Sequence, residues 1–244
     1  MSNIQKIALI TGAARRIGAE IATSLHKAGY GVVLHCRQSR QEAECLAATL
    51  NAQRNDSAWV MQADLQSVTQ INRLIDQLLS QHGRLDVLIN NASSFYPTPI
   101  SEVNEQQWDE LLGSNLKAPF FLSQAAFPAL AKHEGCIVNM VDIYAKRALP
   151  NYPVYSSAKA GLYALTETLA KELAPKVRVN AVSPGVIFWP ENNEPEQADE
   201  VLKKVPLQRQ GKASDIAEMV LFLVEKASYI TGQIIAVDGG KSLV

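Results

Sequence analysis

The chain has 244 residues and a mass of 26.7 kDa, and 47% of its residues are hydrophobic, enough for a sizeable core within one large domain. Its 23 Lys and Arg residues nearly balance 24 Asp and Glu residues, giving a net charge of -1 and a pI of about 6.4. This balance disfavours a nucleic-acid partner or an anionic membrane surface. No apolar run approaches the roughly 18–20 residues that a membrane span requires.

The cysteines and histidines indicate the compartment. Cys36, Cys45 and Cys136 are an odd number without paired spacing, which argues against a disulfide framework and for a reducing environment. The four histidines show no metal-ligand spacing. The opening "MSNIQKIALITG" suits a first buried strand better than a cleavable signal. We therefore expect a cytoplasmic protein without a metal ion.

Short apolar runs alternate with helical patterns along the chain. The helical patterns include residues 68–79, where apolar side chains recur every three or four positions and form one face. The apolar runs are β-branched and read as strands buried on both faces, as in a parallel sheet. This alternation predicts an α/β fold, a doubly wound Rossmann-type parallel sheet in a single domain over 1–244. The predicted strands lie within residues 6–12, 31–36, 58–65, 85–93, 136–142, 177–185 and 232–240.

One stretch departs from this pattern. Residues 188–200, "FWPENNEPEQADE", are polar and contain proline, and they form too long a segment for a core connection. Such segments on a rigid scaffold often cover a binding site. We expect a substrate loop at about residues 186–206.

The segment "ALITGAARRIGAEIA" reads as strand, glycine turn and helix. Gly12 and Gly18 let a diphosphate approach the helix N-terminus, where backbone N–H groups and a partial positive charge attract anions. Arg15 and Arg16 lie inside the turn, so at least one guanidinium is expected on the phosphates; the alternative is a solvated basic pair.

The end of the second predicted strand indicates which dinucleotide binds. An acidic residue about 20 positions after the glycines accepts from a ribose 2′-hydroxyl and repels a 2′-phosphate. Here "LHCRQSR" supplies Arg37, Ser39 and Arg40, with no carboxylate before Glu42. This pattern favours NADPH. Asp64, after the third strand, either lines the same site or caps the following helix.

Tyr155 and Lys159 are four residues apart, so on a helix they share one face. A nearby ammonium favours the phenolate and lowers the pKa of the phenol, which helps it donate a proton near neutral pH. The pattern alone is common and fits a surface pair. The combination with other motifs is more specific. The same chain contains, in this order, the glycine turn, "NNAS" after a strand, Asn115, the Tyr155 and Lys159 pair, and "VDGG" near the end.

That combination resembles the short-chain dehydrogenase/reductase family over essentially the whole chain. The resemblance implies a nicotinamide cofactor at the glycine turn, Lys159 on its ribose, Tyr155 as proton donor, Asn115 holding a proton-relay water, and a homotetramer, with helices at 101–132 and 153–174 supplying its interfaces. The turn and the resemblance together give these expected cofactor-binding residues: Gly12, Arg15, Arg16, Ile17, Gly18, His35, Arg37, Gln38, Ser39, Asp64, Leu65, Asn91, Ala92, Ser93, Tyr155, Lys159, Pro184, Gly185 and Val186.

Two departures from the family pattern are similar to its pteridine reductase branch. Asp142 stands where most members have a serine thirteen residues before the tyrosine, and Arg16 stands at the middle glycine of the turn. "NNASSFYPTP" also replaces the usual Asn-Asn-Ala-Gly. One feature differs from the branch: Gln38 precedes Ser39 where an arginine is usual, so the side chain that holds the 2′-phosphate stays open. The resemblance implies a pterin site made of Arg16, Ser93, Phe95, Asp142, Tyr155 and Lys159.

The chemistry of Asp142 favours the same assignment. A carboxylate facing a developing alkoxide would repel it by about 4 kcal/mol at 4 Å and an effective dielectric near 20. Reduction of a ring C=N instead leaves a nitrogen that must gain a proton, and a carboxylate beside Tyr155 keeps the phenol protonated. Phe95 can stack on a flat heterocycle, although plugging the edge of the core is its alternative role.

The leading hypothesis is an NADPH-dependent pteridine reductase acting on a pterin or dihydropterin, and on folate or dihydrofolate, as small-molecule substrates. Its catalytic residues are then Asp142, Tyr155, Lys159 and Asn115. The alternatives are a carbonyl reductase of the same family, for instance on 3-oxoacyl thioesters, and a non-catalytic NADPH-binding sensor.

Overall fold

A computed structural model describes residues 5–147, 149–188 and 200–244. Within these ranges the strands form one seven-stranded sheet, in the order β3-β2-β1-β4-β5-β6-β7, in which each neighbouring pair is parallel. The predicted doubly wound Rossmann-type fold is confirmed. Most of the predicted substrate loop, residues 189–199, lies outside the described residues. The strands are β1 (Ile7–Ile10), β2 (Gly31–Cys36), β3 (Ala58–Gln62), β4 (Val87–Asn90), β5 (Cys136–Met140), β6 (Arg178–Pro184) and β7 (Ile234–Val237).

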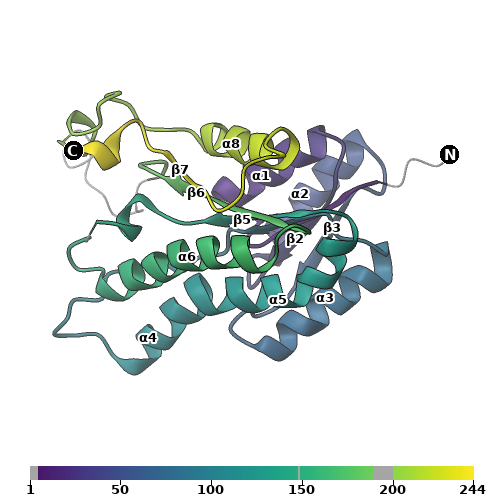
Figure 1. The fold of residues 1–244 in the computed structure, drawn as a ribbon, viewed down its shortest axis with the longest axis horizontal. Coiled ribbons are helices and arrows are strands. Elements are labelled where there is room, and N and C mark those ends of the chain that lie inside the picture. The colour runs from purple at the N-terminus through teal and green to yellow at the C-terminus, as the bar shows by residue number, and fades with distance from the viewer. Residues whose placement is uncertain (1–4, 148, 189–199) are drawn as a thin grey trace.

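Helices cover both faces of the sheet (Figure 1). One face carries α1 (Arg16–Lys27), α2 (Arg40–Gln53) and α8 (Ala213–Glu225). The other carries α3 (Val68–His82), α4 (Glu105–Leu112), α5 (Ala118–Lys132) and α6 (Pro153–Glu172). The predicted helix at 101–132 begins at Glu105 instead, and it contains a π-helical turn at Gly113–Lys117 between α4 and α5.

Successive side chains of a strand enter two different hydrophobic cores. On β1, Ile10 belongs to the cluster that contains Ile21 of α1, whereas Leu9 belongs to the cluster that contains Leu74 of α3. Because both faces are covered, β1 is buried at every position. This is why the strand sequences read as continuous apolar runs instead of alternating ones.

The strand order reverses direction at β1, which has β2 on one side and β4 on the other. The connection that follows β1 runs over one face of the sheet and the connection that follows β4 runs over the other. A crevice therefore opens beyond the carboxyl ends of these two strands. The glycine turn follows β1, and the segment beginning "NASSFYPTP" follows β4. The fold thus brings the two most distinctive motifs to one place.

Among the described residues, no helix is long and apolar enough to cross a membrane.

The opposite end of the sheet is held by a buried ion pair. Asp86 Oδ2 accepts hydrogen bonds from the Ile7 amide at 2.8 Å and from Arg84 Nε at 2.9 Å, and Asp86 Oδ1 accepts from Arg84 Nη2 at 2.5 Å. The carboxylate therefore joins the start of β1 to the start of β4.

We predict that Asp86→Ala lowers the free energy of unfolding by about 3 kcal/mol, because it leaves a largely buried guanidinium and a buried amide without their acceptor. Urea denaturation measures the change. Arg40→Ala is the control, since it breaks the exposed Arg40–Glu44 pair and is expected to cause no measurable loss. Equal losses in the two variants would contradict the prediction.

Candidate active site

The glycine turn is closed tightly against the end of β4. Gly12 has φ +61°, and a Cβ there would lie 2.9 Å from the Cα of Ala92. A Cβ on Gly18 would lie 2.3 Å from the carbonyl oxygen of Gly12. Both positions therefore require glycine, which supports the predicted role of this turn as a close-approach site.

Thr11 and Asn91 tie the turn to the loop after β4. Asn91 Nδ2 donates to the carbonyl oxygens of Thr11 (2.8 Å) and Gly12 (3.1 Å). In return, Thr11 Oγ1 accepts from the amides of Asn91 and Ala92, each at 2.9 Å. Sequence analysis did not select Thr11, although a threonine directly before the first glycine was a usable signal. These bonds fix the distance across the crevice.

His35 supports the turn from below. Its ring is buried, Nδ1 accepts from the Gly12 amide at 3.2 Å, and Nε2 lies 3.0 Å from the carbonyl oxygen of Ala63. Burial lowers the pKa of His35 to about 4, with Asp64 and the Ala63 carbonyl acting in the opposite direction. The imidazole is therefore neutral near pH 7, with its proton on Nε2. His35 connects the carboxyl ends of β1, β2 and β3.

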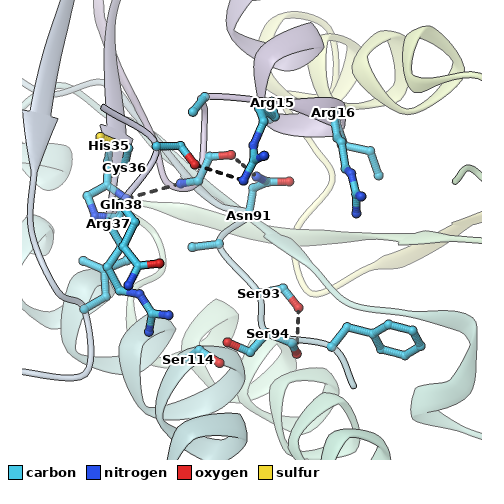
Figure 2. A pocket seen from close by; sticks show the side chains of 18 of the residues that line it. Arg15, Arg16, His35, Cys36, Arg37, Gln38, Asn91, Ser93, Ser94 and Ser114 are labelled. Carbon is cyan, nitrogen blue, oxygen red and sulfur yellow. Dashed lines mark hydrogen bonds between the residues drawn. The ribbon is translucent and has the colours of Figure 1, made fainter. Parts of the chain in front are cut away.

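Arg15 and Arg16 leave the turn in different directions (Figure 2). Arg15, whose side chain is 65% exposed, donates from Nη2 to Ser39 Oγ at 3.0 Å and lies 3.7 Å from Glu42. Arg16 has φ +55°, a conformation that favours glycine, and its guanidinium lies 5.8 Å from the ring centroid of Phe188. The arginine thus keeps the backbone geometry of the glycine that the family pattern has there.

A cavity of about 540 Å³ runs along these residues, within the range of small-molecule sites. It contains most of the predicted cofactor set, and sequence analysis missed only a few of its members. The predicted residues that line it are Gly12, Arg15, Arg16, Ile17, Gly18, His35, Arg37, Gln38, Ser39, Asp64, Leu65, Asn91, Ala92, Ser93 and Phe95. The missed ones are Ala14, Cys36, Gln66, Ser94, Ser114 and Phe188.

Other predicted residues lie outside this lining. Tyr155 and Lys159 are on α6, and Pro184, Gly185 and Val186 follow or end β6. The Gly185 amide donates to the Val237 carbonyl at 3.1 Å, which ties this segment to β7.

Asp64 does not cap a helix. Ser67 is the N-cap of α3, and its Oγ accepts from the Gln70 amide at 3.4 Å. The Asp64 carboxylate instead accepts from the Gln66 amide at 3.0 Å, within the turn before the helix. The capping alternative is therefore wrong, and Asp64 lines the cavity.

The residues around the turn fit a dinucleotide. The close backbone approach at the two glycines leaves room for a diphosphate, and the first turn of α1 directs backbone N–H groups toward it. Arg15, Arg37 and Ser39 supply donors for further phosphate oxygens along the same cavity.

Three of the four predicted catalytic residues, Asp142, Tyr155 and Lys159, meet at the end of β5. Tyr155 Oη donates to Asp142 Oδ2 at 2.7 Å, and Asp142 Oδ1 accepts from the Tyr144 amide at 2.9 Å. Lys159 Nζ donates to the Met140 carbonyl at 2.8 Å and lies 5.6 Å from the centroid of the Tyr155 ring. Strand β5 and helix α6 thus hold an acid, a phenol and an ammonium in one volume.

Burial controls the charges of this group. It raises the pKa of Asp142, and burial followed by the neighbouring Asp142 raises the pKa of Tyr155 well above its ordinary value. Burial also lowers the pKa of Lys159 to about 8. The expected lowering of the phenol pKa by Lys159 is therefore outweighed, and Tyr155 stays protonated near pH 7.

Phe95 joins the two parts of the site. Its ring lies parallel to that of Tyr152 at 4.6 Å and edge-on to that of Tyr155 at 4.7 Å, and it also lines the cavity. Because 47% of the side chain is exposed, Phe95 does not plug the core. Its free surface is available to a flat ligand next to Tyr155.

Asn115 anchors the loop that carries Phe95. Its Nδ2 donates to the carbonyl oxygens of Ser94 (2.9 Å) and Leu111 (3.0 Å), and its Oδ1 accepts from Ser93 Oγ at 2.6 Å. The residue is buried in the π-helical turn, a feature common at functional sites. Its side-chain amide is therefore committed to the loop, and its role in a water relay stays a prediction.

The fold and site define an oxidoreductase that uses a dinucleotide. Residues 12–242 match the family described as Enoyl-(Acyl carrier protein) reductase. The chain is 41% identical to pteridine reductase 1 of Leishmania tarentolae, over 97% of this chain and 96% of that protein. It is 37% identical to the 3-oxoacyl-(acyl-carrier-protein) reductase FabG of Staphylococcus epidermidis, over 97% and 99%, and 38% identical to that of Staphylococcus aureus, over 96% and 97%.

The chain therefore belongs to the short-chain dehydrogenase/reductase family, whose members bind a nicotinamide cofactor. This confirms the predicted family. The chain is nearly as similar to FabG as to pteridine reductase, so these relatives do not distinguish between the two substrates.

We predict that the buried His35 makes the stability of the fold depend on pH. Since its pKa is lower in the folded chain than the unfolded value of about 6.5, the unfolded state binds more protons as pH falls from about 6.5 to about 4, and stability is lost over that window. Between about pH 7 and pH 5 this residue alone should cost about 2 kcal/mol. Urea denaturation of the parent and of His35→Gln should show a smaller pH dependence in the variant; parallel pH profiles would refute this.

Proposed function

We propose that the protein is an NADPH-dependent pteridine reductase, which reduces a pterin or dihydropterin, and folate or dihydrofolate, to the tetrahydro form by converting ring C=N bonds to CH–NH. The observation that carries the proposal is the 2.7 Å hydrogen bond between the buried Tyr155 and the partly buried Asp142. The 41% identity to a pteridine reductase supports it.

The carboxylate distinguishes nitrogen from oxygen chemistry. In ketone reduction the substrate oxygen becomes an alkoxide, which a carboxylate at this position would repel. In C=N reduction the product nitrogen takes up a proton, and no anion has to be stabilised next to Asp142. After Tyr155 has donated its proton to the substrate, Asp142 takes up a proton from solvent and passes it to the phenolate, a step that the raised pKa of Asp142 favours.

Each residue then has a defined task. The nicotinamide supplies the hydride to a ring carbon when it is bound. Tyr155 donates its phenolic proton to the adjacent ring nitrogen, and Asp142 accepts the hydrogen bond that keeps the phenol oriented. Lys159 and Tyr155 would hold the nicotinamide ribose. Phe95 presents its exposed face for stacking, worth on the order of 1 kcal/mol, and Arg16 and Ser93 contribute polar groups at the cavity wall.

The preference for NADPH follows from the charges at the end of β2. Arg37, Ser39 and Arg15 line the cavity there, while Glu42, the first carboxylate along this segment, lies 3.7 Å from Arg15. We assign the 2′-phosphate to these donors. Arg40 is directed instead to Glu44, at 2.7 Å.

A second candidate is a carbonyl reductase acting on 3-oxoacyl thioesters, favoured by the 37–38% identity to FabG. A sensor that binds NADPH without turnover is disfavoured by the retained Tyr155, Lys159 and Asn115. We further propose a cytoplasmic homotetramer. The tetramer interface would use α5 and α6, where Phe120 of α5 is 40% exposed. The cytoplasmic location is supported by the three cysteines, which are all free thiols.

NADPH oxidation with biopterin, dihydrobiopterin, dihydrofolate and a 3-oxoacyl thioester tests the proposal. We expect turnover with at least one pterin and little with the thioester. Asp142→Ser should lower kcat for the pterin by at least about tenfold and raise ketone reduction, because the repulsion is removed. No turnover with any pterin, or a parent enzyme that prefers the thioester, would reject the proposal.

A further inference from the structure

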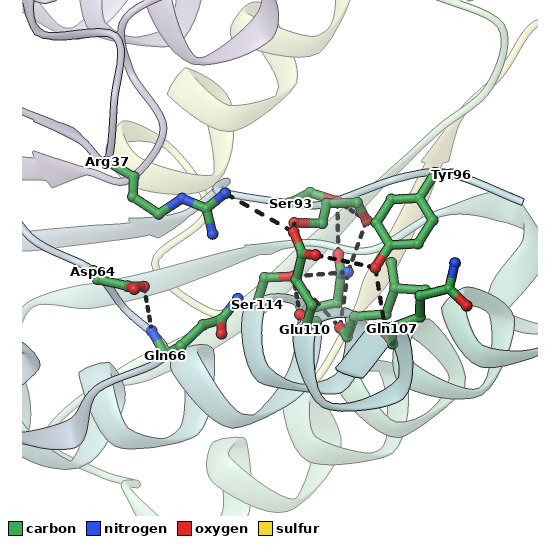
Figure 3. A network of polar contacts seen from close by, with 11 residues as sticks. Arg37, Asp64, Gln66, Ser93, Tyr96, Gln107, Glu110 and Ser114 are labelled. Atoms are coloured by element: carbon green, nitrogen blue, oxygen red, sulfur yellow. Dashed lines mark hydrogen bonds and ion pairs between the residues drawn. The ribbon is translucent and has the colours of Figure 1, made fainter. Parts of the chain in front are cut away.

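Glu110 lies outside the catalytic group, yet it contacts both parts of the site. It projects from α4 toward the loop after β4, between Arg37 and Tyr96 (Figure 3). None of the roles assigned above uses it. Its contacts go to two segments that are far apart in the sequence, at the end of β2 and after β4.

The first set of contacts fixes the loop around Phe95. Glu110 Oε1 accepts from Ser94 Oγ at 3.3 Å, and Oε2 accepts from Tyr96 Oη at 3.2 Å. Both chain neighbours of Phe95 are therefore bound by one carboxylate. Burial, followed by the charge of Glu110, raises the pKa of Tyr96, so its hydroxyl remains a donor.

The second contact restrains Arg37. Its Nη2 lies 3.9 Å from Glu110 Oε1, and both side chains are partly exposed, at 42% and 32%. An exposed pair at this distance contributes little free energy, so a phosphate dianion can replace the carboxylate as the partner of Arg37.

The surroundings of Arg37 increase this competition. A second cavity of about 630 Å³ adjoins the first and shares Arg37, Gln38, Asp64 and Gln66 with it. Among the described residues that line it, Arg37 is the one cation, opposite four acids, Asp64, Glu105, Asp109 and Glu110. A phosphate at this end of the site therefore depends on Arg37 and is opposed by the nearby carboxylates.

We propose that Glu110 is a positioning residue that holds Phe95 in place and sets how strongly Arg37 favours a 2′-phosphorylated dinucleotide. This inference rests on the proposed function. Binding of the 2′-phosphate moves Arg37 from Glu110 to the phosphate, and the carboxylate then serves only Ser94 and Tyr96. Cofactor selection and the placement of the stacking ring thus depend on one side chain.

Glu110→Gln separates the two effects, because glutamine keeps an acceptor for Tyr96 but loses the charge. We expect the Kd for NADP+ to fall about threefold to tenfold, the Kd for NAD+ to change less than about twofold, and the KM for dihydrobiopterin to stay near that of the parent. Tyr96→Phe should have the opposite pattern, with an unchanged Kd for NADP+ and a KM for dihydrobiopterin raised about tenfold at similar kcat.

Asp109→Asn is the matched control, since Asp109 is on the same helix and lines the same acidic cavity. It should change both dinucleotide Kd values less than about twofold. If Asp109→Asn tightens NADP+ as much as Glu110→Gln, or if Glu110→Gln has no effect, the inference is overturned. If the parent itself does not bind NADP+ more tightly than NAD+, the proposed cofactor preference fails instead, and the two failures are thereby distinguished.

Discussion

The hydrogen bond between Tyr155 and Asp142 is the interaction on which the chemistry of this site depends. It joins a buried phenol to a partly buried carboxyl group. Burial raises the pKa of both groups, and Asp142 raises the pKa of Tyr155 further, whereas the hydrogen bond from Tyr155 lowers the pKa of Asp142. A buried ammonium, Lys159, lies beside them with its pKa lowered to about 8. Near neutral pH the phenol therefore stays protonated and can donate a proton, which the proposed reduction of a ring C=N bond requires.

The sheet makes this pairing possible by setting strand ends side by side. β5 ends two residues before Asp142, β4 ends before the loop that carries Phe95, and β1 ends before the glycine turn. Short cross-links then fix these ends relative to one another. Thr11 with Asn91 closes the gap between β1 and β4, and His35 joins β1 to β2 and β3. The rigid cofactor side thus supports a loop whose position depends on Asn115 and Glu110.

Much of this organisation could be predicted from local sequence patterns. Continuous apolar runs specified the strands, because burial on both faces leaves no alternation, and the glycines specified the turn, because a side chain there would collide with backbone. The π-helical turn between α4 and α5 was missed, since it has no simple periodic signature.

Roles that depend on tertiary neighbours could not be read from the sequence. His35 was expected to bind cofactor because it lies at the end of the second strand; it does line the cavity, and the structure adds that its ring bonds to the turn and lies next to the Ala63 carbonyl. Asp64 offered a helix cap that Ser67 supplies instead. Glu110 looked like any solvated helix residue, and only its approach to Arg37, Ser94 and Tyr96 distinguishes it.

The most direct test of the central claim is the ultraviolet titration of Tyr155, taken as the difference between the parent and Tyr155→Phe. A phenol governed by burial and Asp142 should show no phenolate signal up to about pH 10, the ordinary tyrosine pKa, and Asp142→Asn should shift the signal to lower pH. A Tyr155 phenolate near neutral pH in the parent, or a titration unchanged by Asp142→Asn, would contradict it.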